Sequence, residues 1–393
     1  MAAKLTLSRR PDINPRMSTA FAAYVADSLK SEQFTLIDVG CSGGIDPAWR
    51  VFGERLRAVA FDASLDECER LTREETNPSV KYVGGFVGLP PDHPFAIRQG
   101  SHPWFVRNPM QRTSCWRMLQ IQKERLETAS LEEKLRHNAW NMTKLADPNK
   151  PVIVPDVLKD LGWADVDLLK IDIDGPDFAV LNSFDGRFDD LGLLAARLEV
   201  NLYGGTAETE HAFHNTDRFM RARGFELMAL DVRTYAMAAL PSPFAITSPA
   251  QTVTGRPFQA EAFYARDPAG QDWRQFGQNL SAEKMAKLAA IFSIWQQPDA
   301  AAELLLEYRE KLSPGFDVQT GLELLTQQAQ EQAEVPLSYA EYIAAFEADA
   351  PSFYPPPSDP PPPPPPPPRT LGRRLRAALQ SFLNPDDAAF GRD

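Results

Sequence analysis

A short run near the start of the chain combines an acidic residue with a glycine-rich loop. The run FTLIDVGCSGG is an apolar strand that ends at Asp38 and continues into Gly40, Gly43 and Gly44. Glycine tolerates positive φ and has no side chain, so such a loop lets a ligand approach the backbone closely. The run lacks the G-x-G-x-x-G of a dinucleotide site and the G-K-[ST] of a phosphate loop. We therefore expect a ligand without a pyrophosphate.

A second acid, Asp62, ends the next apolar run, 18 residues after Gly44. In open α/β folds an acid at this strand end accepts hydrogen bonds from both ribose hydroxyls of a nucleoside. A tight strand-to-helix turn alone would also explain the glycines, but the loop and Asp62 together favour S-adenosylmethionine. The predicted cofactor-binding residues are Asp38, Gly40, Cys41, Ser42, Gly43, Gly44, Asp62, Ala63, Gly85, Phe86 and Asp172.

Acidic residues also end two later apolar runs. Asp172 and Asp174 follow one run, and Glu199 closes the next. Methyl transfer from a sulfonium to an alcohol requires in-line alignment, exclusion of water and a base that accepts the hydroxyl proton. Asp172, Glu199 and His214 are the predicted candidates for that base, with Asp172 closest to the reacting atoms. Two alternatives are a Mg²⁺ ion held by Asp172, Asp174 and Glu199, and simple capping of the helix that follows.

The stretch 166–184, VDLLKIDIDGPDFAVLNSF, resembles the signature of the FkbM family of S-adenosylmethionine-dependent methyltransferases, D-L-L-K-I-D-x-[ED]-G-x-[ED]. The matching residues are Asp167, Leu168, Leu169, Lys170, Ile171, Asp172, Asp174, Gly175 and Asp177. The family's D-V-G-A-N-x-G motif is matched by Asp38, Val39, Gly40 and Gly44, with Cys41 and Ser42 in place of Ala and Asn. The family's second motif corresponds to Ala60, Phe61, Asp62 and Ala63. The resemblance covers residues 32–267.

This resemblance implies an S-adenosylmethionine-dependent O-methyltransferase that acts on a hydroxyl of a sugar, a glycan or a glycan-linked metabolite. Family members often carry a serine-containing turn in the region of Arg112 and Ser114, so these residues and Asp174 are the predicted acceptor contacts. The alternative function is a non-catalytic scaffold that keeps a degenerate methyltransferase fold and acts through its helical region and tail. A nicotinamide dehydrogenase is disfavoured because the third glycine of its fingerprint is missing.

Short runs of branched apolar residues alternate with helix-compatible segments over residues 34–230, after a leading helix. This alternation predicts an α/β fold with a Rossmann-like methyltransferase sheet, mostly parallel, with helices on both faces. The run 259–266 is predicted as an antiparallel strand at the sheet edge. The predicted domains are a methyltransferase domain (1–270, with an insertion or cap at 87–154), a helical region (271–350), a disordered Pro-rich linker (351–368) and a basic amphipathic tail (369–393).

Composition excludes several other classes. The 393 residues include 41 basic and 53 acidic side chains, which argues against a nucleic-acid partner because backbone affinity needs an excess of Lys and Arg. There is no long apolar run, and the three cysteines form no metal pattern, so we expect a cytoplasmic protein. Residues 369–383 place leucines opposite arginines. This pattern predicts contact with a partner or with the inner face of the membrane, and a solvated terminal helix is the alternative.

Overall fold

The computed structural model describes residues 19–353 except 31, 90–92, 96–111, 138, 186, 189, 239–251, 253–254, 271–272 and 331–335. The chain divides into two units, Met1–Tyr339 and Ala340–Asp393. The second unit holds helix α14 (Tyr339–Ala348), which begins at the boundary, and the short helix η5 (Ala350–Phe353). The predicted linker beyond Phe353 and the predicted tail lie outside the described residues. No helix within the described ranges is long and apolar enough to span a membrane.

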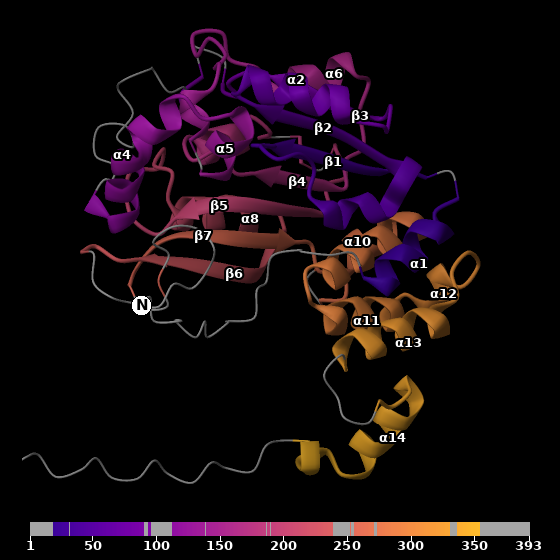
Figure 1. Cartoon of the computed structure of the whole chain (residues 1–393). Helices are drawn as coiled ribbons and strands as arrows, with labels where there is room; N and C mark the ends of the chain where they lie inside the picture. Colours follow the sequence, from indigo (N-terminus) through magenta and orange to yellow (C-terminus); the bar gives the residue numbers. More distant parts are fainter. Residues whose placement is uncertain are drawn as a thin grey trace, which may run out of the picture. The chain divides into compact units, whose positions relative to one another are not determined.

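The first unit is built on a seven-stranded sheet with the order β3-β2-β1-β4-β5-β7-β6 (Figure 1). The strands are β1 (Phe34–Val39), β2 (Leu56–Asp62), β3 (Val80–Gly84), β4 (Leu168–Ile171), β5 (Ala195–Asn201), β6 (Glu226–Tyr235) and β7 (Arg256–Ala265). The first five form parallel pairs, and β7 runs antiparallel to both of its neighbours. The predicted α/β sheet is therefore confirmed.

The place of β7 differs from the prediction, because it lies between β5 and β6 and leaves β6 at the edge. Eight of its ten residues are buried, whereas β6 is only half-buried along most of its length. A strand that is buried on both faces needs a hydrogen-bonding neighbour on each side, and an edge position cannot provide both. The apolar character of β7 thus explains its internal position.

Helices cover both faces of the sheet, as predicted. One face packs against α6 (Val154–Asp160), α7 (Asp177–Asn182) and α8 (Phe213–Arg221). The opposite face packs against α1 (Ala20–Ser28), η1 (Pro47–Arg55), α2 (Leu65–Glu74) and four helices from the end of the unit. These are α10 (Ala282–Ile294), α11 (Pro298–Glu307), α12 (Arg309–Leu312) and α13 (Val318–Ala329), preceded by α9 (Arg274–Asn279). Helices α1 and α10–α13 lie side by side although hundreds of residues separate them (Figure 1).

The predicted insertion 87–154 is partly helical where it is described. It contains α4 (Ser114–Glu127), α5 (Leu131–Arg136) and the short η3 (Trp140–Met142). Its last part runs back along the turn that follows β2. Thr143 Oγ1 donates to Ser64 Oγ over 2.8 Å, and the Ala146 amide donates to the Ala63 carbonyl over 2.9 Å. The insertion thus lies directly beside the residues that follow Asp62.

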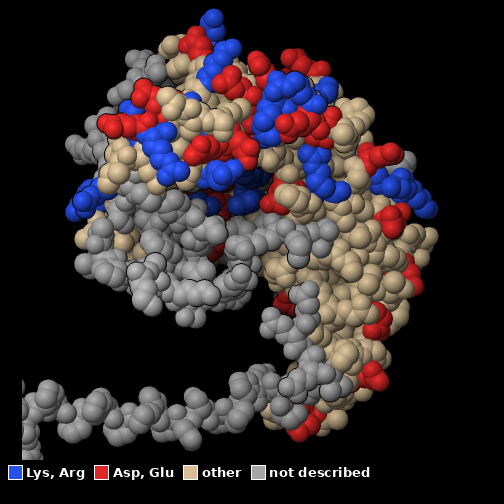
Figure 2. All heavy atoms as spheres, viewed as in Figure 1, with Lys and Arg blue, Asp and Glu red and all other residues tan. Residues whose placement is uncertain are grey.

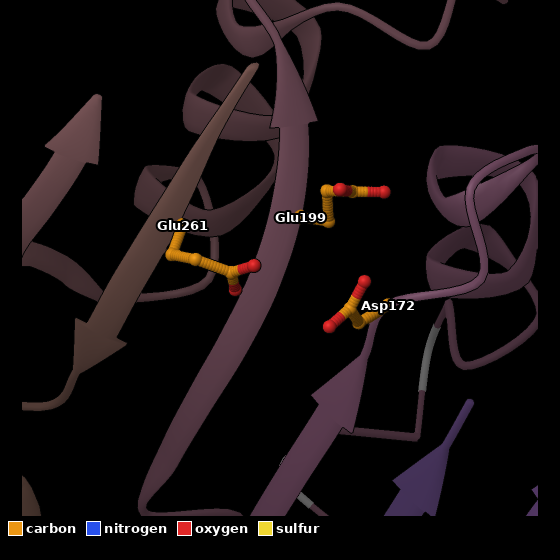
Figure 3. Close-up of side chains that lie close together, drawn as sticks. All are labelled: Asp172, Glu199 and Glu261. Carbon is orange, nitrogen blue, oxygen red and sulfur yellow. The ribbon is translucent and has the colours of Figure 1, made fainter. Parts of the chain in front are cut away.

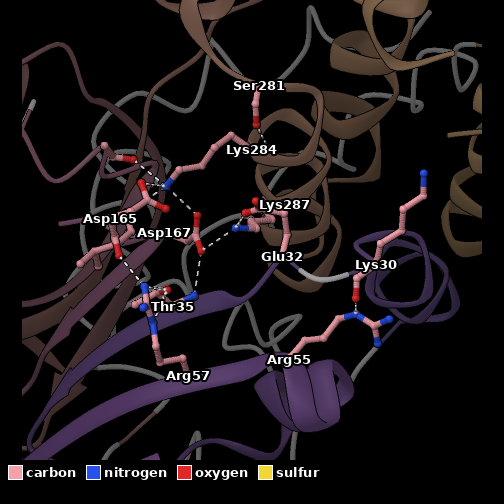
Figure 4. A network of polar contacts seen from close by, with 12 residues as sticks. Lys30, Glu32, Thr35, Arg55, Arg57, Asp165, Asp167, Ser281, Lys284 and Lys287 are labelled. Atoms are coloured by element: carbon pink, nitrogen blue, oxygen red, sulfur yellow. Dashed lines mark hydrogen bonds and ion pairs between the residues drawn. The ribbon is translucent and has the colours of Figure 1, made fainter. Parts of the chain in front are cut away.

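A buried carboxylate joins helix α10 to the amino-terminal end of the sheet (Figure 4). Asp167, which is fully buried, accepts the Thr35 amide over 2.7 Å and lies 2.7 Å from Lys284 Nζ and 3.4 Å from Lys287 Nζ. Lys287 is itself only 1% exposed. A buried charge is tolerated only when it is paired and hydrogen-bonded. Asp167 therefore anchors the late helices to the strands.

We expect Asp167→Asn to lower the free energy of unfolding by about 3–5 kcal/mol, because it removes the buried negative charge that faces the two lysines. Asp165→Asn is the matched control, since Asp165 also pairs with Lys284, at 2.8 Å, but its side chain is 47% exposed. That variant should lose less than about 1 kcal/mol. Urea denaturation followed by circular dichroism measures both, and equal losses would contradict the anchoring role of Asp167.

Candidate functional site

The site lies where the connections after two adjacent strands cross to opposite faces of the sheet. Strands β1 and β4 are adjacent, yet η1 follows β1 onto one face and α7 follows β4 onto the other. Such a switch point opens a crevice at the carboxyl ends of the two strands, where open α/β folds bind their ligands. The predicted loop 40–44 and Asp172 both follow these strand ends.

The loop is held by its backbone between β2 and β4. Gly40 has a φ of +91°, and a Cβ atom on it would lie 1.8 Å from the carbonyl oxygen of Asp172. The amides of Gly40 and Cys41 both donate to the Phe61 carbonyl, over 2.8 and 3.0 Å. Only glycine fits at position 40, because a side chain would collide with the neighbouring strand end.

Glu67 of helix α2 holds the other end of the loop, although sequence reasoning gave it no role. Its carboxylate is fully buried and accepts the Gly43 amide over 2.9 Å. Arg70 pairs with the same carboxylate at 2.7 Å and balances its charge. The Gly44 amide closes a turn on the Cys41 carbonyl at 2.8 Å. Both ends of the loop are therefore fixed before any ligand binds.

The predicted residues at the ends of β2 and β3 lie together around Asp62. One carboxylate oxygen of Asp62 accepts the Ser64 amide over 2.8 Å, and the Asp62 carbonyl accepts the Gly85 amide over 2.8 Å. Burial of the carboxyl raises the pKa of Asp62. Ala63 and Phe86 contact the insertion through their carbonyls, which accept amides from Ala146 and Val152. These hydrogen bonds hold Asp62 in place at the end of β2.

Lys170 connects the ends of β1 and β4. Its Nζ lies 3.0 Å from Asp38 Oδ1 and 3.9 Å from Asp172 Oδ2, and it also donates to the Gly40 carbonyl. Burial by itself would lower the pKa of Lys170, but Asp38 and Asp172 raise it above its usual value, so the amine stays charged. Lys170 stands in the predicted motif, but its role as the link between these groups was not predicted.

Asp172 is an ionised carboxylate at neutral pH. Burial alone would raise its pKa, but the charges of Lys170, Arg233 and Arg197 hold the pKa below its usual value. Its side chain is 26% exposed, whereas the side chain of Glu199 is 1% exposed. Of these two acidic residues, Asp172 is therefore the one whose carboxylate a ligand can reach.

Glu199 belongs to a buried charge network on strands β5, β6 and β7. It lies directly opposite Glu261 in the sheet register, an arrangement that would be repulsive without cations. Arg233 pairs with both glutamates, lying 3.1 Å from Glu199, and Arg197 pairs with Glu261 at 3.0 Å. Burial, followed by the charges of Asp174 and Asp172, raises the pKa of Glu199 well above its usual value.

The carboxylates of Asp172, Glu199 and Glu261 converge, with one oxygen of each within 4.8 Å of the others (Figure 3). Asp174, which the predicted Mg²⁺ alternative also used, is not part of this group. Arg233 pairs with Glu199 and Arg197 pairs with Glu261. The negative charges of the two glutamates are therefore already balanced by side chains of the protein. Mg²⁺ prefers carboxylates and waters in an octahedral shell. The group does not fit a resident Mg²⁺ ion.

A cavity of about 190 Å³ opens between the loop and the sheet face. Its wall includes the predicted residues Asp38, Gly40, Ser42, Gly44 and Asp172, and residues that were not predicted: Asp46, Trp49, Lys170, Arg197 and Trp295. Three acidic and two basic side chains line it, which favours a ligand with net positive charge.

On the surface shown in Figure 2, acidic and basic side chains are interspersed above the sheet.

Other predicted residues lie elsewhere. His214 is exposed in the first turn of α8, which covers the face of the sheet opposite to Glu199. The neighbouring His211 is buried instead and lies 3.7 Å from Asp177, which accepts the Ile173 and Gly175 amides and so fixes the turn after β4. Asp174 is exposed at a φ of +52°. Arg112 is exposed before α4, and the side chain of Ser114 lies outside the described part.

No protein-family model and no curated protein matches this chain, so the resemblance to the FkbM family stays a prediction. Among solved structures, a TehB-like SAM-dependent methyltransferase from Corynebacterium glutamicum is 10% identical and covers 63% of this chain and 87% of its own, with a TM-score of 0.25. The 23S rRNA methyltransferase ErmE is 11% identical and covers 79% of this chain and 97% of its own, also with a TM-score of 0.25. Similarity at this level assigns no activity.

We expect Gly40→Ala to lower the free energy of unfolding by more than about 3 kcal/mol, because the new methyl group collides with the Asp172 carbonyl. Gly43→Ala is the matched control: its φ is +87°, but nothing lies within 4 Å of the added atom. That variant should lose only about 1–2 kcal/mol, the cost of the left-handed backbone. Thermal and urea unfolding compare the two, and a smaller loss at Gly40 than at Gly43 would refute the close approach.

Proposed function

We propose that this protein transfers a methyl group from S-adenosylmethionine to a hydroxyl group of a sugar, a glycan or a glycan-linked metabolite. The observation that carries the proposal is the glycine loop at the switch point of the sheet, with Asp62 fixed at the next strand end and Asp172 at the other. The motif around Lys170 supports the cofactor class through its resemblance to the FkbM family. The sugar acceptor rests on that resemblance alone.

The residues at the site suit a cationic nucleoside. In this proposal the carboxylate of Asp62 accepts the two ribose hydroxyls. The cavity beside residues Gly40 and Gly44 takes another part of the cofactor. Asp38, Asp46 and Asp172 give the cavity its excess of negative charge, which attracts a sulfonium and an ammonium group. When bound, the cofactor supplies an electrophilic methyl group. Lys170 pairs with both Asp38 and Asp172, and its charge helps to hold the pKa of Asp172 below its usual value.

The chemical task of the protein is then to align the acceptor and to remove its proton. Asp172 accepts that proton, because it is the ionised and partly exposed carboxylate at the end of β4. Arg197 and Arg233 favour its negative charge before the reaction. Glu199 holds Arg233 in place and does not itself receive the proton, because its side chain is buried against that arginine.

Isothermal titration calorimetry with S-adenosylmethionine tests the cofactor. The wild type should bind, and Asp62→Ala should weaken binding about a hundredfold or more, because charge-assisted hydrogen bonds to two hydroxyls are lost. Glu69→Ala, an exposed position on the same helix α2, is the control and should bind as the wild type does. Circular dichroism verifies that both variants are folded. Unchanged binding by the folded Asp62→Ala variant would refute the nucleoside assignment.

Turnover with a panel of monosaccharides tests the base. Asp172→Asn should reduce kcat about 10²- to 10⁴-fold, the usual contribution of a general base, with the fold retained because the two side chains have nearly the same size. Asp174→Asn, on the exposed part of the same turn, should cost much less. An equal loss in both variants would show that the negative charge of the turn matters and that no single carboxylate is the base.

The pH dependence separates Asp172 from Glu199. A base works only when unprotonated, so activity rises with pH through its pKa. The pKa of Asp172 lies below its usual 3.8, so its ascending limb falls below about pH 4, and kcat/KM should be flat from pH 5 to 7. The pKa of Glu199 is raised well above 4.5, so an ascending limb that disappears in Glu199→Gln would identify Glu199 as the base. A limb that persists in that variant would instead belong to Asp174 or Asp177, whose pKa values burial raises to about 6 and about 7.

A further inference from the structure

Asp46 lines the cavity at the glycine loop, although sequence reasoning assigned it no role. It stands directly before η1, and its Oδ1 accepts the Ala48 amide over 2.9 Å, so the side chain caps that helix. Its other oxygen, Oδ2, accepts no hydrogen bond from the residues that the structure describes and is open to solvent. An ionised carboxylate only accepts, so a ligand group that contacts Oδ2 must be a donor.

Asp46 differs from the other two acidic residues of the cavity because it lacks a cation. Lys170 Nζ lies 3.0 Å from Asp38 and 3.9 Å from Asp172, whereas Asp46 forms no ion pair within the described part of the chain. Burial raises the pKa of Asp46, which shows that its charged form is only partly compensated. A cationic donor is therefore the ligand group that complements Asp46 best.

The size of the cavity indicates which part of the cofactor enters it. Pockets that enclose a whole small-molecule ligand usually measure about 300–1,000 Å³. At about 190 Å³ this cavity takes only a fragment, and Asp62, the proposed ribose contact, does not line it. The fragment that remains is the amino-acid end, which carries an ammonium group and a carboxylate. A wall with both acidic and basic side chains suits such a group.

We infer that Asp46 accepts a hydrogen bond from the ammonium group of the cofactor's amino-acid end, and that it selects for a ligand with this group. This inference rests on the proposed function. Lys170 and Arg197 line the same cavity and supply positive charge for the carboxylate of the same ligand. The hydrogen bond to the Ala48 amide already fixes the Asp46 side chain, so little side-chain entropy is lost on binding.

Calorimetric binding of two ligands to the full chain tests the contact. The ligands are S-adenosylmethionine and its deaminated form, in which hydrogen replaces the amino group while the sulfonium and the carboxylate remain. Asp46→Asn keeps the size of the side chain and the helix cap, and it removes the negative charge. The variant should bind S-adenosylmethionine about tenfold to a hundredfold more weakly, as expected for a lost hydrogen bond between charged groups. It should bind the deaminated form within twofold of the wild type.

Asp317→Asn is the matched control, because Asp317 also caps a helix, α13, by accepting the Gln319 amide over 3.1 Å, but does not line the cavity. It should leave both affinities unchanged, and thermal unfolding without ligand verifies that both variants are folded. Equal weakening of the two ligands by Asp46→Asn would show that the residue acts without contacting the ammonium group, and no weakening would place that group elsewhere. Either result would overturn the inference. A wild type that binds neither ligand would instead overturn the proposed function, and this inference with it.

Discussion

The structure depends on keeping charges paired inside a sheet face that is otherwise apolar. Asp38, Lys170 and Arg197 stand in one row across three adjacent strands, and Glu199 faces Glu261 one step further. Removing one member would leave a buried charge without its partner, which costs far more than an exposed ion pair is worth. The pairing fixes each side chain in a single arrangement. The carboxylate of Asp172 is therefore presented in one orientation at the end of β4.

The same constraint explains why the glycine loop cannot vary freely. Lys170 reaches Asp38, Asp172 and the Gly40 carbonyl only because β1 and β4 lie close enough for Gly40 to touch the Asp172 backbone. A larger residue at position 40 would push the strands apart and would also lengthen the ion pairs. Glycine at position 40 is therefore required both for the close packing of the two strand ends and for the ion pairs of Lys170. Glu67 of helix α2 restricts the loop further, because its carboxylate accepts the amide of Gly43.

Local sequence patterns predicted the parts of the fold that depend on local signals. The alternation of apolar runs predicted the mostly parallel sheet. The acidic residues that close these runs predicted Asp38, Asp62 and Asp172 near the carboxyl ends of β1, β2 and β4. The edge position predicted for the strand at 259–266 was wrong, although the apolar residues of this run indicated a buried strand. The alternation of Arg197 and Glu199 on an apolar strand was also a readable signal of a charged interior.

Other features depend on contacts between distant segments. Arg233 and Glu261 gain their roles only when β6 and β7 pair, and no local pattern marks them. Trp295 enters the cavity because α10 packs on the sheet, which the helical periodicity of α10 could not indicate. The sequence singled out His214, which is exposed, and did not show that its neighbour His211 is the buried histidine. Burial decides the chemistry of such residues, and burial is a property of the whole fold.

The anchor between Asp167 and Lys284 also has a consequence for synthesis of the chain. The two residues are 117 positions apart, so Asp167 and the sheet face around it emerge from the ribosome long before the helices that cover them. At about 5–20 residues per second, this delay lasts roughly 6–23 seconds. During that time an apolar surface and a carboxylate without its lysines are open to solvent. The nascent chain therefore exposes this surface for longer than a protein whose sheet is covered by its own crossover helices.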